Sequence, residues 1–100
     1  MTIRHCVLVR FQPDADVTLI FAELKGLANK IDGIISITAG ADNSPEGLQR
    51  GHSHGFTVDF RDAKSRDAYL PHPEHQKVGA LIVAAADGGI DGVTVLDWDV

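Results

Sequence analysis

The chain has 100 residues, of which 44% are hydrophobic and 23% are charged, with ten glycines and four prolines. This length and composition predict one globular domain over residues 1–100 and exclude a disordered or fibrous protein. Fourteen acidic against nine basic side chains give a formal charge of −5, and no run of Lys or Arg forms a stripe, so nucleic acid is not expected as a partner.

Two further features concern the compartment. The single cysteine, Cys6, has no partner for an internal disulfide, and the N-terminal segment alternates like a strand instead of resembling a signal peptide. No apolar stretch approaches the roughly 20 residues needed to cross a bilayer. We therefore expect a cytoplasmic protein that makes no contact with a membrane.

In chain order, the first half of the sequence predicts a strand, a helix and a second strand. Hydrophobic residues alternate over 3–11, which is typical of a strand. Apolar residues at helical spacing then predict a helix over 15–31, with a turn and a cap supplied by QPDAD. The β-branched run over 34–41 predicts the second strand, and the polar segment that follows is typical of a surface loop.

The second half predicts a strand, two helices and a last strand. Alternation returns over 52–60, after which Asp62 is expected to cap a short helix that ends near Tyr69. The LPHP stretch ends this helix because proline disfavours helical geometry in the residue before it. A third helix begins at Pro73, with His72 as its cap, and GVTVLDWDV forms the last strand.

The order β-α-β-β-α-α-β predicts an α+β fold, namely a ferredoxin-like split βαβ protomer whose antiparallel sheet carries its helices on one face. The other face of such a sheet must be solvated or covered by a partner. Its outward residues on the first strand include Cys6 and Leu8, which favours a partner. Because two-fold dimers are the commonest assemblies, we expect a homodimer in which two open faces pack as a dimeric α/β barrel.

Four side chains that can transfer protons are expected to point into the space between sheet and helices. His5 and His54 share their strand faces with apolar residues. His75 leads the apolar row of the third helix, and Tyr69 ends the helix before it. We expect all four to converge in a mostly apolar cavity, the usual form of a small-molecule site. The predicted lining residues are Phe21, Leu24, Phe56, Val58 and Ile82.

Tyr69 and His75 are the candidates for catalysis. The first turn of a helix opposes a positive imidazolium and should lower the pKa of His75, which makes the neutral ring a competent base near pH 7. Tyr69 can donate a proton or a hydrogen bond to an oxyanion on a carbonyl substrate. The pair therefore predicts enolisation or aldol-type proton transfer on a small apolar carbonyl-bearing ligand, without a cofactor.

Two alternatives stay open from the residues alone. In the first, the histidines form a buried hydrogen-bonded pair and Tyr69 with His75 fastens the broken helix, so the protein is a non-catalytic barrel. In the second, His52 and His54 bind a metal ion with help from another histidine. No recognised zinc spacing appears and no second cysteine is present, so we predict no metal site.

Four segments resemble the stress-responsive dimeric α/β-barrel family, often called Dabb domains: IRHCVLVRF, IISITAGADNSPEG, HSHGFTVDFRDAKSRDAYLPHPEH and VTVLDWDV. The likeness spans nearly the whole chain. Its most specific parts are His5, the pair His54 and Gly55, and Tyr69 followed by HPEH. The resemblance implies the same ferredoxin-like protomer and the same two-sheet dimer.

The resemblance also implies candidate roles for individual residues. One enzyme of the family, the plant olivetolic acid cyclase, closes a linear polyketide by an aldol step. Its catalytic tyrosine and histidine match Tyr69 and His75, and the strand histidines of its pocket match His5 and His54. The family thus implies either a cyclase-like or lyase-like activity or, as in its heat-stable stress proteins, a structural barrel.

Overall fold

The computed structural model describes all 100 residues. Its elements are β1 (Ile3–Val9), α1 (Val17–Gly26), β2 (Ile34–Ala41), β3 (His54–Phe60), α2 (Ala63–Tyr69), α3 (Pro73–Ala85) and β4 (Val93–Asp99), with short 3-10 helices η1 (Leu27–Asn29) and η2 (Gly89–Gly92). The predicted order of strands and α-helices is confirmed. None of the helices has the length and apolar character that crossing a bilayer requires.

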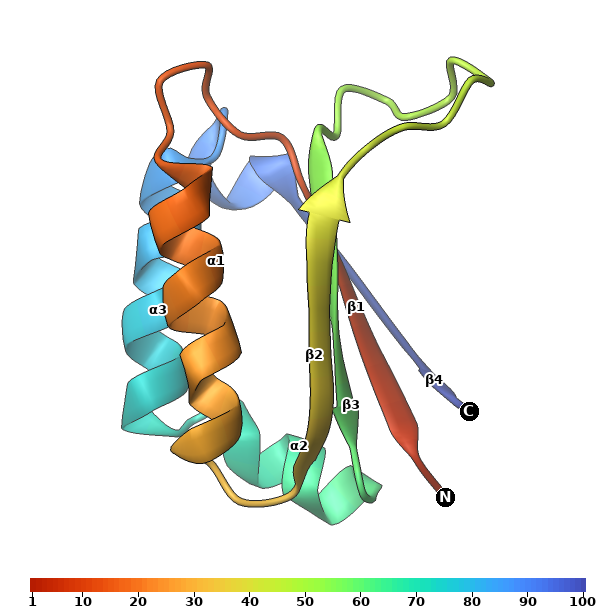
Figure 1. Ribbon diagram of the computed structural model, residues 1–100, viewed down its shortest axis with the longest axis vertical. Coiled ribbons are helices and arrows are strands. Elements are labelled where there is room, and N and C mark those ends of the chain that lie inside the picture. Colours follow the sequence, from red (N-terminus) through yellow and green to blue (C-terminus); the bar gives the residue numbers. More distant parts are fainter.

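The four strands form one antiparallel sheet in the order β2-β3-β1-β4, which is the ferredoxin-like arrangement. The register places His5 of β1 opposite Val58 of β3 and opposite Asp97 of β4. Helices α1 and α3 lie side by side over one face of the sheet, and α2 lies near the end of this layer (Figure 1). The other face of the sheet carries no helix, as predicted.

The core lies between the sheet and the helix layer. Inward strand residues such as Val9, Val58 and Phe60 are fully buried, and Leu24 of α1 and Ile82 of α3 pack toward them. Burial of each such side chain stabilises the fold by about 1.5–3 kcal/mol. The alternating apolar residues of the strands therefore hold the sheet and the helix layer together.

Side-chain caps determine where the helices begin. Asp16 accepts a hydrogen bond from the Leu19 backbone N–H at 3.1 Å, so α1 begins at Val17 and not at residue 15. Asp62 caps α2 and His72 caps α3, both as predicted. The predicted end of the first helix at residue 31 is wrong, because the chain tightens into η1 after residue 26.

Three strand boundaries also differ from the sequence prediction. The first strand ends at Val9, because Phe11 forms an isolated bridge with Ala86 and no longer pairs with β3. The third strand begins at His54, since the side chain of His52 instead bonds the loop and β4. The last strand begins one residue later than predicted, because Gly92 belongs to η2.

Candidate functional site

A cleft of about 260 Å³ opens between α3 and the inward faces of β1 and β4. Its lining is largely apolar, and His5 from β1 and His75 from α3 supply its only polar side chains. The apolar part consists chiefly of Val7, Phe56, Ile82, Val83, Val93 and Val95. An apolar cleft with a few convergent polar groups is the usual form of a small-molecule site.

His75 lies in the first turn of α3 and is held by the carbonyl that ends α2. Its Nδ1–H donates to the Leu70 carbonyl oxygen at 2.9 Å, which leaves Nε2 unprotonated in the neutral ring. Burial disfavours the charged ring and lowers the pKa of His75, although the bond to Leu70 acts in the opposite direction. The pKa of His75 is lowered, as expected, but the main cause is burial and not the helix N-terminus that the sequence analysis named. The neutral ring presents a basic nitrogen.

Tyr69 packs against this imidazole. The two ring centroids lie 4.2 Å apart, and the Tyr69 ring lies 6.1 Å from that of His5. The Tyr69 side chain is buried, and burial alone raises its pKa well above the usual range. With no hydrogen bond to a protein group, the phenol stays protonated and keeps a free donor.

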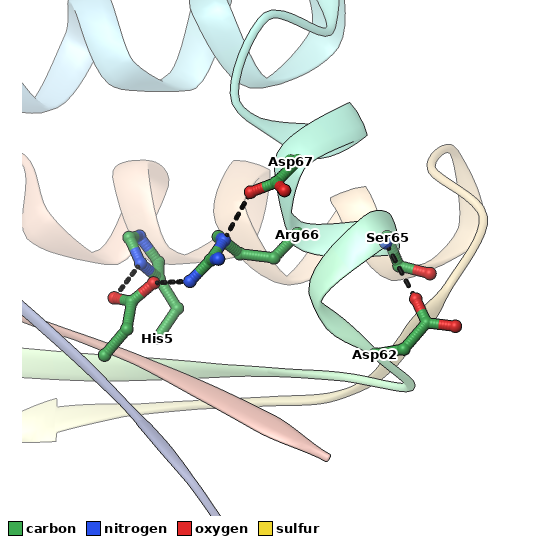
Figure 2. Close-up of polar contacts among 6 residues, drawn as sticks. His5, Asp62, Ser65, Arg66 and Asp67 are labelled. Atoms are coloured by element: carbon green, nitrogen blue, oxygen red, sulfur yellow. Dashed lines mark hydrogen bonds and ion pairs between the residues drawn. The ribbon is translucent and has the colours of Figure 1, made fainter. Parts of the chain in front are cut away.

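His5 is buried and is fixed by a carboxylate on the neighbouring strand. Its Nδ1 lies 2.8 Å from Oδ1 of Asp97, the residue directly opposite in the β1–β4 register. The other carboxylate oxygen accepts a bond from Arg66 at 2.8 Å, and Arg66 also donates to Asp67 (Figure 2). Burial would raise the pKa of Asp97, but the bonds from Arg66 and His5 outweigh it and lower the pKa.

The Nε2 atoms of both imidazoles have no hydrogen-bond partner in the protein. Each ring uses Nδ1 for its bond to the protein. Every fully buried polar side-chain atom in the chain has a hydrogen-bond partner, so these two unpartnered nitrogens are not sealed in the core. The space available to them is the cleft that both rings line.

The structure does not bring His54 into this group. The β1–β3 register pairs His54 with Val9, which lies four residues, or about 13 Å, along β1 from His5. The His54 ring instead packs against Phe11 and Phe21, at centroid distances of 5.3 and 5.8 Å. Of the four side chains expected to converge in one cavity, His5 and His75 line the cleft. Tyr69 packs against the His75 ring but is not among the residues that line the cleft, and His54 lies elsewhere.

The other predicted lining residues also separate into groups. Phe56 and Ile82 line the cleft, as expected. Leu24 and Val58 do not, because both are completely enclosed in the core. Phe21 lies with His54 in the aromatic cluster at the other end of the sheet.

Two residues at the site were missed by the sequence analysis. Asp97 shares the inward face of the last strand with Val93, Val95 and Asp99, and only its position opposite His5 in the register distinguishes it from Asp99. Arg66 carries no signal in the sequence, because its reach to β4 depends on where α2 packs. No three His, Cys, Asp or Glu side chains lie close enough together to hold a metal ion.

Gly79 is a further missed residue of the cleft. It lies in the middle of α3, where glycine costs about 0.5–1 kcal/mol relative to alanine. Its φ is not positive, and a Cβ built on it would meet no atom within 4 Å. Neither backbone conformation nor close packing therefore requires glycine at this position.

The chain matches the family described as the stress responsive A/B barrel domain over residues 3–100. A stress-response A/B barrel domain-containing protein of Arabidopsis thaliana is 32% identical over 98 residues, which cover 97% of this chain and 85% of that protein. The chain belongs to the stress-responsive A/B barrel family. The resemblance found in the sequence is confirmed.

Solved structures agree with this A/B barrel assignment. A dimeric ferredoxin-like protein of unknown function from Jannaschia sp. CCS1 has a TM-score of 0.91 and 29% identity, with all of both chains covered. The hydroxynitrile lyase from Passiflora edulis has a TM-score of 0.86 and 18% identity, covering 99% of this chain and 93% of that one. At 18% identity, the second likeness concerns the fold alone.

The bonds around Asp97 predict a pH-dependent contribution to stability. Asp97→Asn should lower the free energy of unfolding near pH 7 by about 1–3 kcal/mol, because an amide does not replace the charged acceptor of His5 and Arg66. The folded-state pKa of Asp97 is lowered, so its contribution is present above about pH 4 and is lost as pH falls through the folded pKa. Urea denaturation from neutral to acidic pH should therefore show a steeper loss for the wild type than for the variant.

The matched control is Asp99→Asn on the same strand, because Asp99 makes no side-chain hydrogen bond or ion pair. This control should follow the wild-type profile. Parallel pH profiles for the wild type and Asp97→Asn would contradict the role assigned to the carboxylate.

Proposed function

We propose that this A/B barrel domain binds a small, apolar, carbonyl-bearing molecule in the cleft and transfers protons at the carbon next to its carbonyl group. The observation that carries this proposal is the pair of anchored imidazoles, each with a free Nε2, at one end of an apolar cleft. An apolar lining selects an apolar ligand, and unpartnered polar atoms favour a ligand that can bond to them.

In this proposal, His75 is the base and Tyr69 the hydrogen-bond donor. Nε2 of the neutral His75 takes a proton from the carbon next to the carbonyl, and the electron pair of that C–H bond forms an enolate. The Tyr69 hydroxyl donates to the enolate oxygen as its negative charge develops. The enolate carbon then regains the proton from His75. Alternatively, it forms a C–C bond with a second carbonyl of the same molecule, whose oxygen becomes an alkoxide and takes the proton from His75, as in an aldol-type cyclisation.

His5 is the candidate ligand-binding group at the same end of the cleft. The Asp97 carboxylate, 2.8 Å from Nδ1, fixes the orientation of the ring. Nε2 is then the ring atom left to bond a polar group of the ligand. Asp97 and Arg66 therefore act as positioning residues, because they fix the ring orientation without entering the cleft.

A relative of the same fold supports catalysis on this scaffold. The Passiflora edulis protein is named as a hydroxynitrile lyase, so an enzyme can be built on this arrangement of sheet and helices. We take no substrate from that protein. The reaction proposed here rests on the cleft of this chain alone.

We also infer that the protein works as a homodimer, joined through the helix-free face of its sheet. Leu8, Leu96 and Trp98 point to that face, and 37%, 65% and 45% of their surfaces are exposed. Exposed apolar groups on one face favour an interface. The Jannaschia protein of the same fold is described as dimeric. The single free cysteine, Cys6, fits the reducing cytoplasm as the compartment.

Two substitutions test the proton transfer with octanone in deuterated water. Tyr69→Phe removes a hydroxyl that has no protein partner, and His75→Asn keeps a donor for the Leu70 carbonyl while removing the basic nitrogen. We expect the wild type to exchange hydrogen next to the carbonyl, measured by NMR. His75→Asn should abolish this exchange, and Tyr69→Phe should slow it about 10²-fold or more.

The thermal unfolding midpoints of both variants should stay close to that of the wild type. His52→Ala, a histidine substitution outside the cleft, is the control and should exchange octanone at the wild-type rate. If the wild type exchanges no hydrogen while both cleft variants unfold at clearly lower temperature, the tyrosine and histidine serve a non-catalytic barrel.

A single charge on the open face tests the dimer. Leu96→Lys should convert the protein to a monomer, because an ammonium group would be buried without a partner between the two sheets. Leu81→Lys places the same charge at an exposed leucine on the helix layer, and it should stay dimeric. Light scattering at micromolar concentration gives the mass of each, and a wild-type monomer would refute the assembly.

A further inference from the structure

The cleft has a polar end and an apolar end. His5 and His75 lie at the first, where β4 finishes and α3 begins, and Asp97 holds His5 there from outside the cleft. Eight helical residues from His75 to position 83 span about 12 Å, and four strand residues from Asp97 to position 93 span a similar length. A volume of about 260 Å³ spread over this length makes the cleft narrow.

Gly79 lies halfway along this path. Residues 75, 79, 82 and 83 form one stripe of α3, because side chains three and four positions apart share a helix face. All four line the cleft, but Gly79 alone contributes bare backbone. A Cβ added there would meet no atom within 4 Å, and along the helix Gly79 lies between His75 and Val83.

We propose that Gly79 determines which ligands this site accepts, by leaving a passage for an unbranched apolar chain. The carbonyl group of the ligand lies beside His5 and His75, and its chain runs past Gly79 toward Val83, Ile90 and Val93. The inference rests on the proposed function and specifies its substrate class as straight-chain ketones and related acyl compounds. Glycine within a helix lowers stability, and the space that the ligand chain needs is the reason for glycine at position 79.

A series of straight-chain methyl ketones from butanone to decanone tests the passage, alongside primary alcohols of the same lengths. NMR titration of the labelled protein measures affinity from the shifts of the Gly79 amide and the Val83 and Val93 methyl groups. For the wild type we expect affinity to rise about fourfold with each added methylene until the chain reaches the end of the cleft.

Gly79→Leu should remove this dependence on chain length while butanone still binds, because only the passage is filled. Gly79→Ala should weaken the longest chains and raise the thermal unfolding midpoint. Ala80→Leu adds the same bulk at the neighbouring, exposed residue of α3 and should keep the wild-type dependence.

The outcomes separate this inference from the proton-transfer proposal. An undiminished rise of affinity with chain length in Gly79→Leu overturns the role of Gly79, whether or not ketones exchange hydrogen. A length effect that Gly79→Leu abolishes supports the passage, even if the wild type exchanges no hydrogen and the catalytic proposal fails. Absence of binding by either series to the wild type overturns both.

Discussion

The hydrogen bond that fixes each cleft imidazole through Nδ1 is the interaction on which the site depends. For His75 the acceptor is a backbone carbonyl, and for His5 it is the Asp97 carboxylate. An imidazole whose one nitrogen is hydrogen-bonded to the protein has only the other nitrogen free to bind a ligand. β1 and α3 lie on opposite sides of the cleft, and each therefore contributes an imidazole whose Nε2 is free for a ligand.

The break between α2 and α3 creates one of these acceptors. The last carbonyls of a helix have no partner within it, and the Leu70 carbonyl at the end of α2 is one of them. Pro73 and the His72 cap start a new helix at once, which places His75 and Gln76 within reach of that oxygen. The prolines thus turn the chain, and the same turn determines the tautomer of the proposed base.

The second acceptor depends on strand register. Asp97 meets His5 because β1 and β4 pair with these residues opposite each other, and Arg66 approaches from α2 to bond the other oxygen of the carboxylate. The network links three elements that are distant in sequence. It keeps the polar end of the cleft in place while the apolar end is held by packing alone.

The sequence predicts the features that depend on neighbouring residues, and it does not predict those that depend on contacts between distant parts of the chain. Alternation and caps are local, so the element order, the Asp62 and His72 caps and the inward direction of His5 and His75 were predictable. Position along a strand after pairing is not local, which is why His54 was wrongly placed beside His5. The roles of Arg66 and Gly79 depend on how helices pack over the sheet, and a single sequence carries no signal for that.

The most direct test of this account is the tautomeric state of His75, measured by long-range proton–nitrogen NMR in the free protein near pH 7. The account predicts a neutral ring with its proton on Nδ1 and an unprotonated Nε2. A proton on Nε2, alone or in a charged ring, would leave no base facing the cleft and would contradict it.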